Sequence, residues 1–135
     1  MGAWGPGIFD DDAAYDFIEI IQDADEPTEV FQTSFETALQ AEYLEYDDAH
    51  AVTVSAAYID AVLNGTSYES EDDEAITSFA KANKKLPLAP LKAAAVQALQ
   101  KVIAENSELN ELWKENEELY PQWKQNINAL IERLR

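Results

Sequence analysis

The sequence predicts an all-α protein: a compact, single-domain bundle of five to seven helices that spans residues 1–135. Apolar residues recur at spacings of three and four in six separate segments, and this spacing places them on one face of a helix. Apolar residues also make up 47% of the chain, which is enough to form a core in a domain of this length. We therefore expect more than half of the chain to be helical, with no sheet beyond a short pair of strands.

The first two helices are predicted on either side of a turn at residues 23–27. The first begins near Asp10–Asp12, where carboxylates can cap free N–H groups and face the positive end of the helix dipole, and it runs to about Gln22. The second begins near Pro27, because proline suits the first turn of a helix. The residues expected to face inward are Phe17, Ile20 and Ile21 in the first helix, and Phe31, Phe35, Ala38 and Leu39 in the second.

A third helix is predicted from Ala49 to Leu63, after a start at residues 46–48 and before the stop signal Asn64-Gly65. One face carries Ala51, Val52, Ala56, Ile59, Val62 and Leu63, and the other side carries Val54, Ala57 and Ala61. A helix that is apolar nearly all round is buried on more than one side, so we place it at the centre. Val and Thr at 52–54 also permit a short strand, but the Ala-rich run that follows favours a helix.

The second half of the chain predicts four more helical segments. A fourth helix spans roughly Asp72–Lys84, and a rigid connector at 86–90 leads to a fifth that begins at Pro90. Ser107 is expected to cap a sixth, which Pro121 must kink or end, and a last segment continues to the terminus. The residues expected to face inward are Ile76, Phe79 and Ala80; Leu91, Ala95, Ala98, Leu99, Val102 and Ile103; Leu109, Leu112 and Trp113; and Trp123, Ile127, Leu130, Ile131 and Leu134.

The N-terminal segment is rich in glycine and aromatic residues. Apolar groups at a chain end gain little unless they dock on a core. We therefore expect the first nine residues to be ordered against the helices, with Trp4 and Phe9 mostly buried. The glycine spacing does not fit a phosphate-binding loop, since no strand precedes it, no lysine accompanies it and aspartates follow. Its glycines are instead expected to let the backbone turn tightly around Trp4.

The same opening resembles the start of an uncharacterised, mainly bacterial family, the domain-of-unknown-function 4259 family. Its members begin Met-Gly-x-Trp-Gly-x-Gly-x-Phe-Asp-Asn-Asp-x-Ala-x-Asp-Trp. The positions that match are Gly2, Trp4, Gly5, Gly7, Phe9, Asp10, Asp12, Ala14 and Asp16. Trp113 within Ser-Glu-Leu-x-Glu-Leu-Trp, and Trp123 before the closing Leu-x-x-Arg-Leu, are similar to later family patterns. Asp11 and Phe17 depart from the usual Asn and Trp. The resemblance implies no activity.

The net charge of −18 is unevenly distributed. Residues 1–80 hold 20 Asp and Glu and no Lys or Arg, whereas residues 81–135 hold nine basic and seven acidic residues. Adaptation of a whole proteome to high salt would acidify both parts. The remaining interpretations are a solvated acidic surface and an acidic face directed at a basic protein partner. Nucleic-acid binding is disfavoured, because phosphate contacts need clustered Lys and Arg.

Few residues offer catalytic or metal-binding chemistry. Asp12, Asp16 and Glu19 share a helix face and could bind a hard cation, but the spacing of a calcium loop is absent and helix capping also explains acids at a helix start. His50, the single histidine, is interpreted as a polar residue in the first turn of a helix. The stripe of Trp113, Tyr120 and Trp123 is interpreted as core rather than as a binding surface.

The composition sets the remaining expectations. There is no cysteine, no apolar run long enough to span a membrane and no secretory signal pattern, so we expect a cytoplasmic protein without a cofactor. The leading hypothesis is a small acidic, non-catalytic binding protein, either an immunity-type inhibitor of a bacterial toxin or an adaptor, as a monomer or weak homodimer. The alternative is a carboxylate-based, metal-dependent enzyme. Acids that converge in a cleft favour the enzyme, and acids spread over a convex face favour the binding protein.

Overall fold

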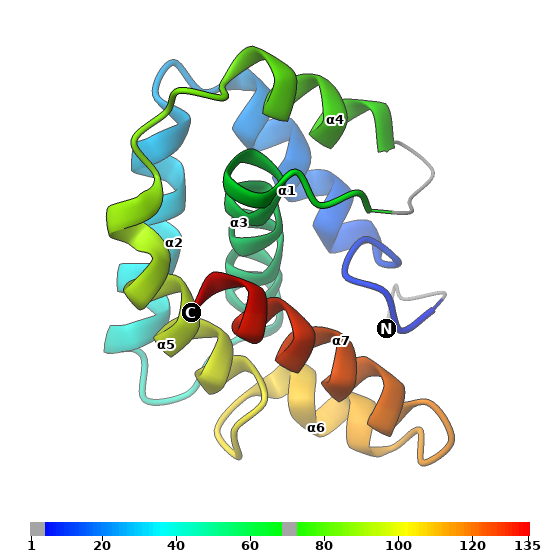
Figure 1. Cartoon of the computed structure of the whole chain (residues 1–135). Coiled ribbons are helices and arrows are strands. Elements are labelled where there is room, and N and C mark those ends of the chain that lie inside the picture. Colours follow the sequence, from blue (N-terminus) through cyan, green and yellow to red (C-terminus); the bar gives the residue numbers. More distant parts are fainter. Residues whose placement is uncertain (1–4, 69–72) are drawn as a thin grey trace.

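The computed structural model describes residues 5–68 and 73–135, and within them the chain forms seven α-helices and one short 3-10 helix (Figure 1). The elements are α1 (Asp12–Asp23), α2 (Pro27–Gln40), α3 (Tyr46–Asn64), α4 (Asp73–Ala82), η1 (Ala89–Leu91), α5 (Lys92–Val102), α6 (Glu108–Lys114) and α7 (Tyr120–Leu134). They cover more than half of the chain, and an isolated parallel bridge joins Leu44 to Ser107. The predicted all-α fold is confirmed.

Helix α3 forms the centre of the bundle. It packs against each of the other six α-helices, which surround it in Figure 1. Every residue from Ala49 to Ala61 is buried, so both the large and the small apolar side of this helix are covered. The helix ends at Gly65, whose φ of 69° is the left-handed conformation that glycine adopts without strain. The central position of this helix and its stop signal are confirmed, and residues 52–54 are helical rather than a strand.

Helix α1 begins where the acidic residues predicted it. Asp11 is the N-cap, and its side chain accepts a hydrogen bond of 2.8 Å from the backbone N–H of Ala13. The buried residues of the helix are Ala14, Ile18 and Ile21. The prediction for Ile20 is wrong, because its side chain is 54% exposed. Successive residues are about 100° apart around a helix, so a face centred on Ile18 and Ile21 turns Ile20 toward solvent. Phe17 is half-buried at the edge of this face.

Helix α2 buries Phe31, Phe35 and Ala38 as predicted, but Leu39 is 37% exposed. Its C-terminal carbonyls are satisfied from a distant part of the chain. The ammonium group of Lys101 donates to the carbonyl oxygens of Ala38 and Ala41 at 2.6 and 2.5 Å. A cation at this position also suits the negative end of the helix dipole. Lys101 thereby fixes α5 against the end of α2.

Several boundaries and faces in the rest of the chain differ from the prediction. Pro90 lies in the 3-10 helix η1 rather than opening α5, which begins at Lys92, and such tight turns are common at helix N-termini. Pro121 does not kink α6, which already ends at Lys114; it is in the first turn of α7, the position that proline prefers.

The residues predicted to face inward in the rest of the chain are not all buried. Ile76 is buried, whereas Leu63 is 36% exposed and three others are half-buried: Phe79, Leu91 and Ile103.

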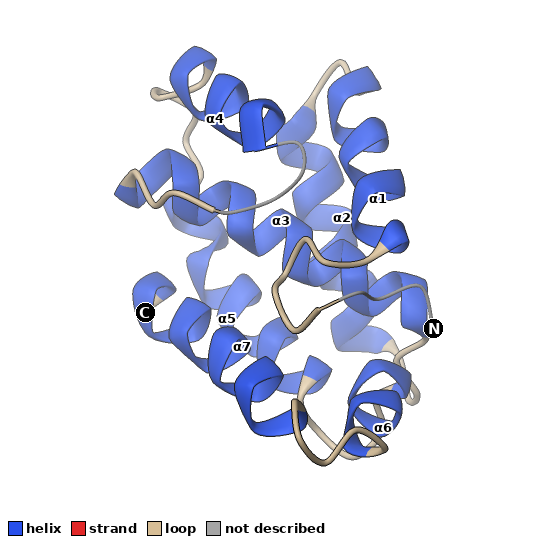
Figure 2. Cartoon of the chain, turned by 90° about the vertical axis from the view of Figure 1, so that its right-hand side faces the viewer, coloured by secondary structure: helices blue, strands red, loops and turns tan. Residues whose placement is uncertain are grey.

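A non-helical contact fixes α6 to the start of α3. The backbone N–H of Leu44 donates to the carbonyl of Asn106 at 2.8 Å, and the N–H of Glu108 donates to the carbonyl of Leu44 at 2.9 Å. The side chain of Glu108 also accepts from the N–H of Tyr46 at 2.8 Å. Helix α6 is therefore held beside α3, and α7 packs against both helices. In Figure 2, α6 and α7 lie on one side of the loop formed by residues 5–10. No helix in the described part of the chain has the length and apolar character needed to cross a membrane.

Candidate functional site

Residues 5–10, called the N-terminal segment from here on, form a tight turn around the carboxylate of Asp10. Oδ2 of Asp10 accepts a hydrogen bond from the N–H of Gly7 at 3.0 Å, and the N–H of Asp10 donates to the carbonyl of Gly7 at 3.1 Å. A Cβ atom added to Gly5 or to Gly7 would lie 2.6 Å from this Oδ2 atom, which is closer than a Cβ atom comes to a non-bonded atom in proteins. Neither glycine has a positive φ. These glycines therefore make room for a carboxylate. Gly2 and Trp4, and with them the turn predicted around Trp4 and the predicted burial of Trp4, lie outside the described residues.

Phe9 anchors the segment to the core, as predicted. Its side chain is 2% exposed and makes edge-to-face contacts with Tyr58 and Tyr68, with ring centroids 6.5 and 5.5 Å apart. Such contacts add to the stabilisation that burial of an aromatic ring provides. A hydrogen bond of 3.0 Å from the side-chain amide of Asn126 to the carbonyl of Pro6 links the segment to α7.

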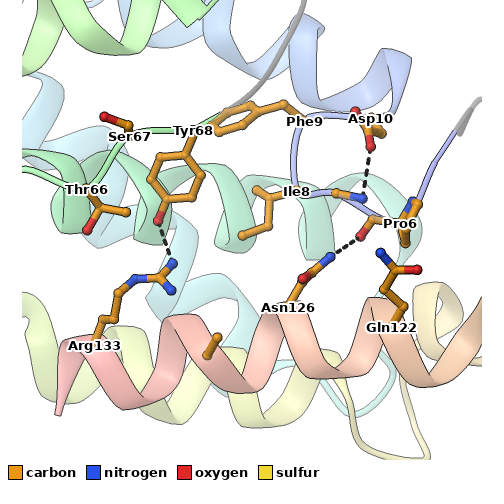
Figure 3. Close-up of a pocket in the computed structure, with 12 residues that line it drawn as sticks. Pro6, Ile8, Phe9, Asp10, Thr66, Ser67, Tyr68, Gln122, Asn126 and Arg133 are labelled. Carbon is orange, nitrogen blue, oxygen red and sulfur yellow. Dashed lines mark hydrogen bonds between the residues drawn. The ribbon is translucent and has the colours of Figure 1, made fainter.

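A cavity of about 660 Å³ lies between this segment, the residues that follow α3 and helix α7 (Figure 3). Its lining residues are Pro6, Gly7, Ile8, Phe9, Asp10, Thr66, Ser67, Tyr68, Gln122, Asn126, Ala129 and Arg133. Figure 3 shows Tyr68 and Arg133 at one end and Asp10 and Gln122 at the other, with Ile8 between them. The described lining combines one guanidinium group, one carboxylate, two side-chain amides and three hydroxyl groups with apolar residues.

A polar network forms the end of this cavity at Arg133. The fully buried carboxylate of Asp60 accepts from Nε of Arg133 at 2.8 Å, from the hydroxyl of Tyr68 at 2.5 Å and from the side-chain amide of Asn64 at 2.7 Å. Nη2 of Arg133 donates in turn to the Tyr68 hydroxyl at 3.1 Å. The network holds α3, α7 and residues 64–68 together, and it fixes the guanidinium group at the cavity wall.

The environment of Asp60 keeps it ionised. Burial alone raises the pKa of its carboxyl, but the hydrogen bonds from Asn64, Tyr68 and Arg133 outweigh burial and hold the pKa below its usual range. For the hydroxyl of Tyr68, burial and the neighbouring Asp60 carboxylate both raise the pKa. The pKa of Arg133 is also raised, because its bonds to Asp60 and Tyr68 outweigh its partial burial. Asp60 and Arg133 therefore form a stable ion pair at neutral pH.

A second buried polar cluster lies at the start of α1. The carboxylate of Asp11 accepts from the hydroxyl of Tyr46, and its Oδ2 atom lies 3.2 Å from Nε2 of His50. Burial raises the pKa of Asp11, but His50, Tyr46 and the N–H of Ala13 outweigh burial and lower it. His50 is indeed in the first part of α3, but it is buried against α1. The cluster connects the start of α1 to α3.

The three carboxylates singled out as a possible metal site do not form one cavity. Asp12, Asp16 and Glu19 are all exposed on α1, and none of them lines the cavity described above. Within residues 5–68 and 73–135, no group of three or more histidines or carboxylates is placed to hold a metal ion. Asp12, Asp16 and Glu19 therefore lie on an exposed face of α1, outside this cavity.

An acidic surface extends over α1, α2 and the start of α3. We use this name for the exposed carboxylates of residues 12–47, which are Asp12, Asp16, Glu19, Asp23, Asp25, Glu26, Glu29, Glu36, Glu42, Glu45 and Asp47. Across the described residues, none of them forms an ion pair with a Lys or Arg side chain. The carboxylates of the acidic surface therefore have no basic partner within the described residues.

This surface predicts a salt-dependent stability. The free energy of unfolding should rise between about 0.01 and 0.1 M sodium chloride, because the Debye length falls from about 30 to about 10 Å and screens the repulsion. Urea denaturation at the two salt concentrations measures the change. A stability that ignores sodium chloride but responds to micromolar calcium or magnesium would contradict this prediction and indicate a metal site.

Comparison with known proteins identifies the family. The family model described as "Domain of unknown function (DUF4259)" matches residues 2–126. The chain belongs to the DUF4259 family. No curated protein matches the chain, and neither does any solved structure. The DUF4259 match includes the N-terminal turn and the start of α7, and it ends at Asn126, before Arg133.

The positions that carried the DUF4259 resemblance have distinct roles. Gly5 and Gly7 accommodate Asp10, while Phe9 and Ala14 pack in the core. Asp12 and Asp16 are exposed. Trp113 and Trp123 are buried and stack with ring centroids 6.0 Å apart, which confirms the interpretation of these two residues of the aromatic stripe as core. Tyr120 is half-buried and packs against the core.

The sequence analysis missed both buried polar clusters. For Asp60 a signal was present: a carboxylate inside a helix that is apolar nearly all round requires a buried partner. Arg133, however, is 73 residues away, and helical periodicity does not pair residues across such a separation. Asp11 was explained as a helix cap and His50 as a polar residue in the first turn of a helix. Neither explanation required a distant partner, so their contact was not predicted.

Proposed function

We propose that this DUF4259 protein is a non-catalytic binding protein whose acidic surface engages a basic protein partner. The observation that supports this proposal is that the exposed carboxylates of residues 12–47 have no Lys or Arg partner within the described chain. Such a surface attracts a basic partner over long distances and speeds their association. It also leaves carboxylates available to pair with the partner's cations.

Two biological roles fit this kind of surface: an immunity-type inhibitor of a bacterial toxin, and an adaptor. Both use charge complementarity, but they differ in the consequence of binding. An inhibitor suppresses the activity of its partner, whereas an adaptor leaves that activity intact and connects the partner to another molecule. The alternative of a carboxylate-based, metal-dependent enzyme is less well supported, since its candidate residues Asp12, Asp16 and Glu19 lie on an exposed helix face.

The test compares two triple variants with the same net charge. The first, Asp16→Asn, Glu19→Gln and Asp23→Asn, neutralises three exposed carboxylates of α1. The control, Glu115→Gln, Glu117→Gln and Glu118→Gln, neutralises three exposed carboxylates between α6 and α7. Each purified protein is immobilised and used to capture partners from lysate of its source cells. Captured proteins are identified by mass spectrometry, and one is then purified for affinity measurements.

We expect a captured partner with a basic surface whose affinity falls as salt rises, because screening weakens attraction between exposed charges. The α1 variant should bind it more weakly than the wild type, and the control variant should bind it as the wild type does. Equal binding by both triple variants, or binding that is independent of salt, would contradict the proposal. The effect of the wild-type protein on the activity of the purified partner then distinguishes an inhibitor from an adaptor.

A further inference from the structure

We propose that the cavity between the N-terminal segment and α7 binds a short peptide by its two charged ends. In this proposal Arg133 binds the terminal carboxylate, and Asp10 faces the terminal ammonium group. The site is separate from the acidic surface, and its ligand is a zwitterion rather than a basic protein. The proposal therefore does not depend on the proposed function.

Arg133 is prepared to bind a carboxylate. Its Nε and Nη2 atoms are held by Asp60 and Tyr68 at 2.8 and 3.1 Å, whereas Nη1 makes no hydrogen bond within the described residues. The side chain is 36% exposed and lines the cavity. A guanidinium group fixed in this way loses little freedom when it donates to a further acceptor, and carboxylates are the acceptors that arginine prefers.

Asp10 supplies the opposite charge at the other end of the cavity (Figure 3). Its Oδ2 atom is occupied by the N–H of Gly7, but Oδ1 makes no hydrogen bond with any described residue. The charge of the whole chain also matters. At a net charge of −18 the protein repels anions, so a ligand whose carboxylate binds Arg133 also needs a positive charge to offset this repulsion. A zwitterion carries both a carboxylate and a positive charge.

The wall between the two ends suits a peptide backbone. Asn126 uses its Nδ2 atom to bind the carbonyl of Pro6, which leaves its Oδ1 atom to accept from a peptide N–H. Asn126 and Arg133 are seven residues apart on α7, which corresponds to about 10 Å along the helix axis. Three residues of extended peptide span about 10 Å, so a peptide whose carboxylate binds Arg133 needs about this length before its N–H groups reach Asn126, and a single amino acid is too short.

The experiment titrates the full chain with four probes and follows binding by NMR and calorimetry. The probes are trialanine, N-acetyl-trialanine, trialanine amide and free alanine. Trialanine should bind saturably and shift the side-chain amide signals of Gln122 and Asn126. Removing either terminal charge should weaken binding by about tenfold or more, the loss expected for a hydrogen bond to a charged group. Free alanine should bind more weakly than trialanine.

Three variants test the assignment of the two ends. Arg133→Lys, which keeps a cation beside Asp60, and Asp10→Asn, whose side-chain carbonyl can still accept from Gly7, should each weaken trialanine binding by about tenfold. Arg135→Gln should bind as the wild type does, because Arg135 pairs with Glu132 and does not line this cavity. The proposal is overturned if wild-type signals of Gln122 and Asn126 do not respond to trialanine. Equal binding of the free and end-blocked peptides would overturn it as well.

Discussion

Replacing Phe9 by alanine is expected to lower the free energy of unfolding by about 3–4 kcal/mol, the usual cost of removing a fully buried aromatic ring. The ring is 2% exposed, and Tyr58 and Tyr68 contact it from α3 and from the residues that follow it. The truncation would leave a void between the N-terminal turn and the core. Urea denaturation followed by circular dichroism measures the loss, which should appear as a lower midpoint with an unchanged slope.

Phe17→Ala is the matched control, since it removes the same ring from a half-buried position on α1. Its effect should be smaller, about 1 kcal/mol, because less apolar surface returns to water. If both variants lost the same amount, the burial of Phe9 would not be the reason for its effect. A loss below about 1 kcal/mol for Phe9→Ala would show that the N-terminal turn contributes little to the core.

The helices and the central position of α3 were predictable because both depend on local patterns. Capping by Asp11, the left-handed stop at Gly65 and the apolar stripes are properties of neighbouring residues. The exact inward face of α1 was not predictable in the same way. Phe17, Ile18, Ile20 and Ile21 spread over about 160° of the helix circumference, which is wider than the face that is buried, so the partner surface on α3 decides which of them is buried.

The candidate site was less predictable, because its contacts join residues far apart in the sequence. The bond from Asn126 to Pro6 spans 120 residues, and the ion pair of Asp60 and Arg133 spans 73. Neither has a local signature. The glycines near the N-terminus were recognisable as a motif, but the physical reason for glycine at these positions was not. A positive φ and a lack of space for a Cβ atom both require glycine, and the sequence alone does not distinguish between them. Here the lack of space around Asp10 is the reason.

Replacing Arg133 by methionine should remove about 3 kcal/mol of stability at pH 7.5, because it leaves the buried carboxylate of Asp60 without its cation. We expect the lower end of the range for broken buried pairs, since the Arg133 side chain is 36% exposed and Asn64 and Tyr68 still donate to Asp60. In the folded wild type the pKa of Asp60 lies below its value in the unfolded chain. Ionised Asp60 therefore makes its full contribution to the free energy of unfolding above the pKa of the unfolded state, and this contribution is lost as the pH falls through the pKa of the folded state.

In the variant, Asp60 loses the hydrogen bond from Arg133 that helps to hold its pKa down, so this pKa should lie above that of the wild type, and acidification should relieve the buried charge at a higher pH. The difference in stability between wild type and variant should therefore be largest at pH 7.5 and should shrink as the pH falls through the pKa of Asp60 in the variant. Urea denaturation at pH 7.5 and at a series of lower pH values measures it. Arg135→Met removes the same charge from an exposed pair with Glu132 and should change stability by less than about 0.5 kcal/mol at every pH. A difference for Arg133→Met that did not vary with pH would mean that lost packing, rather than the uncompensated charge of Asp60, destabilises the variant.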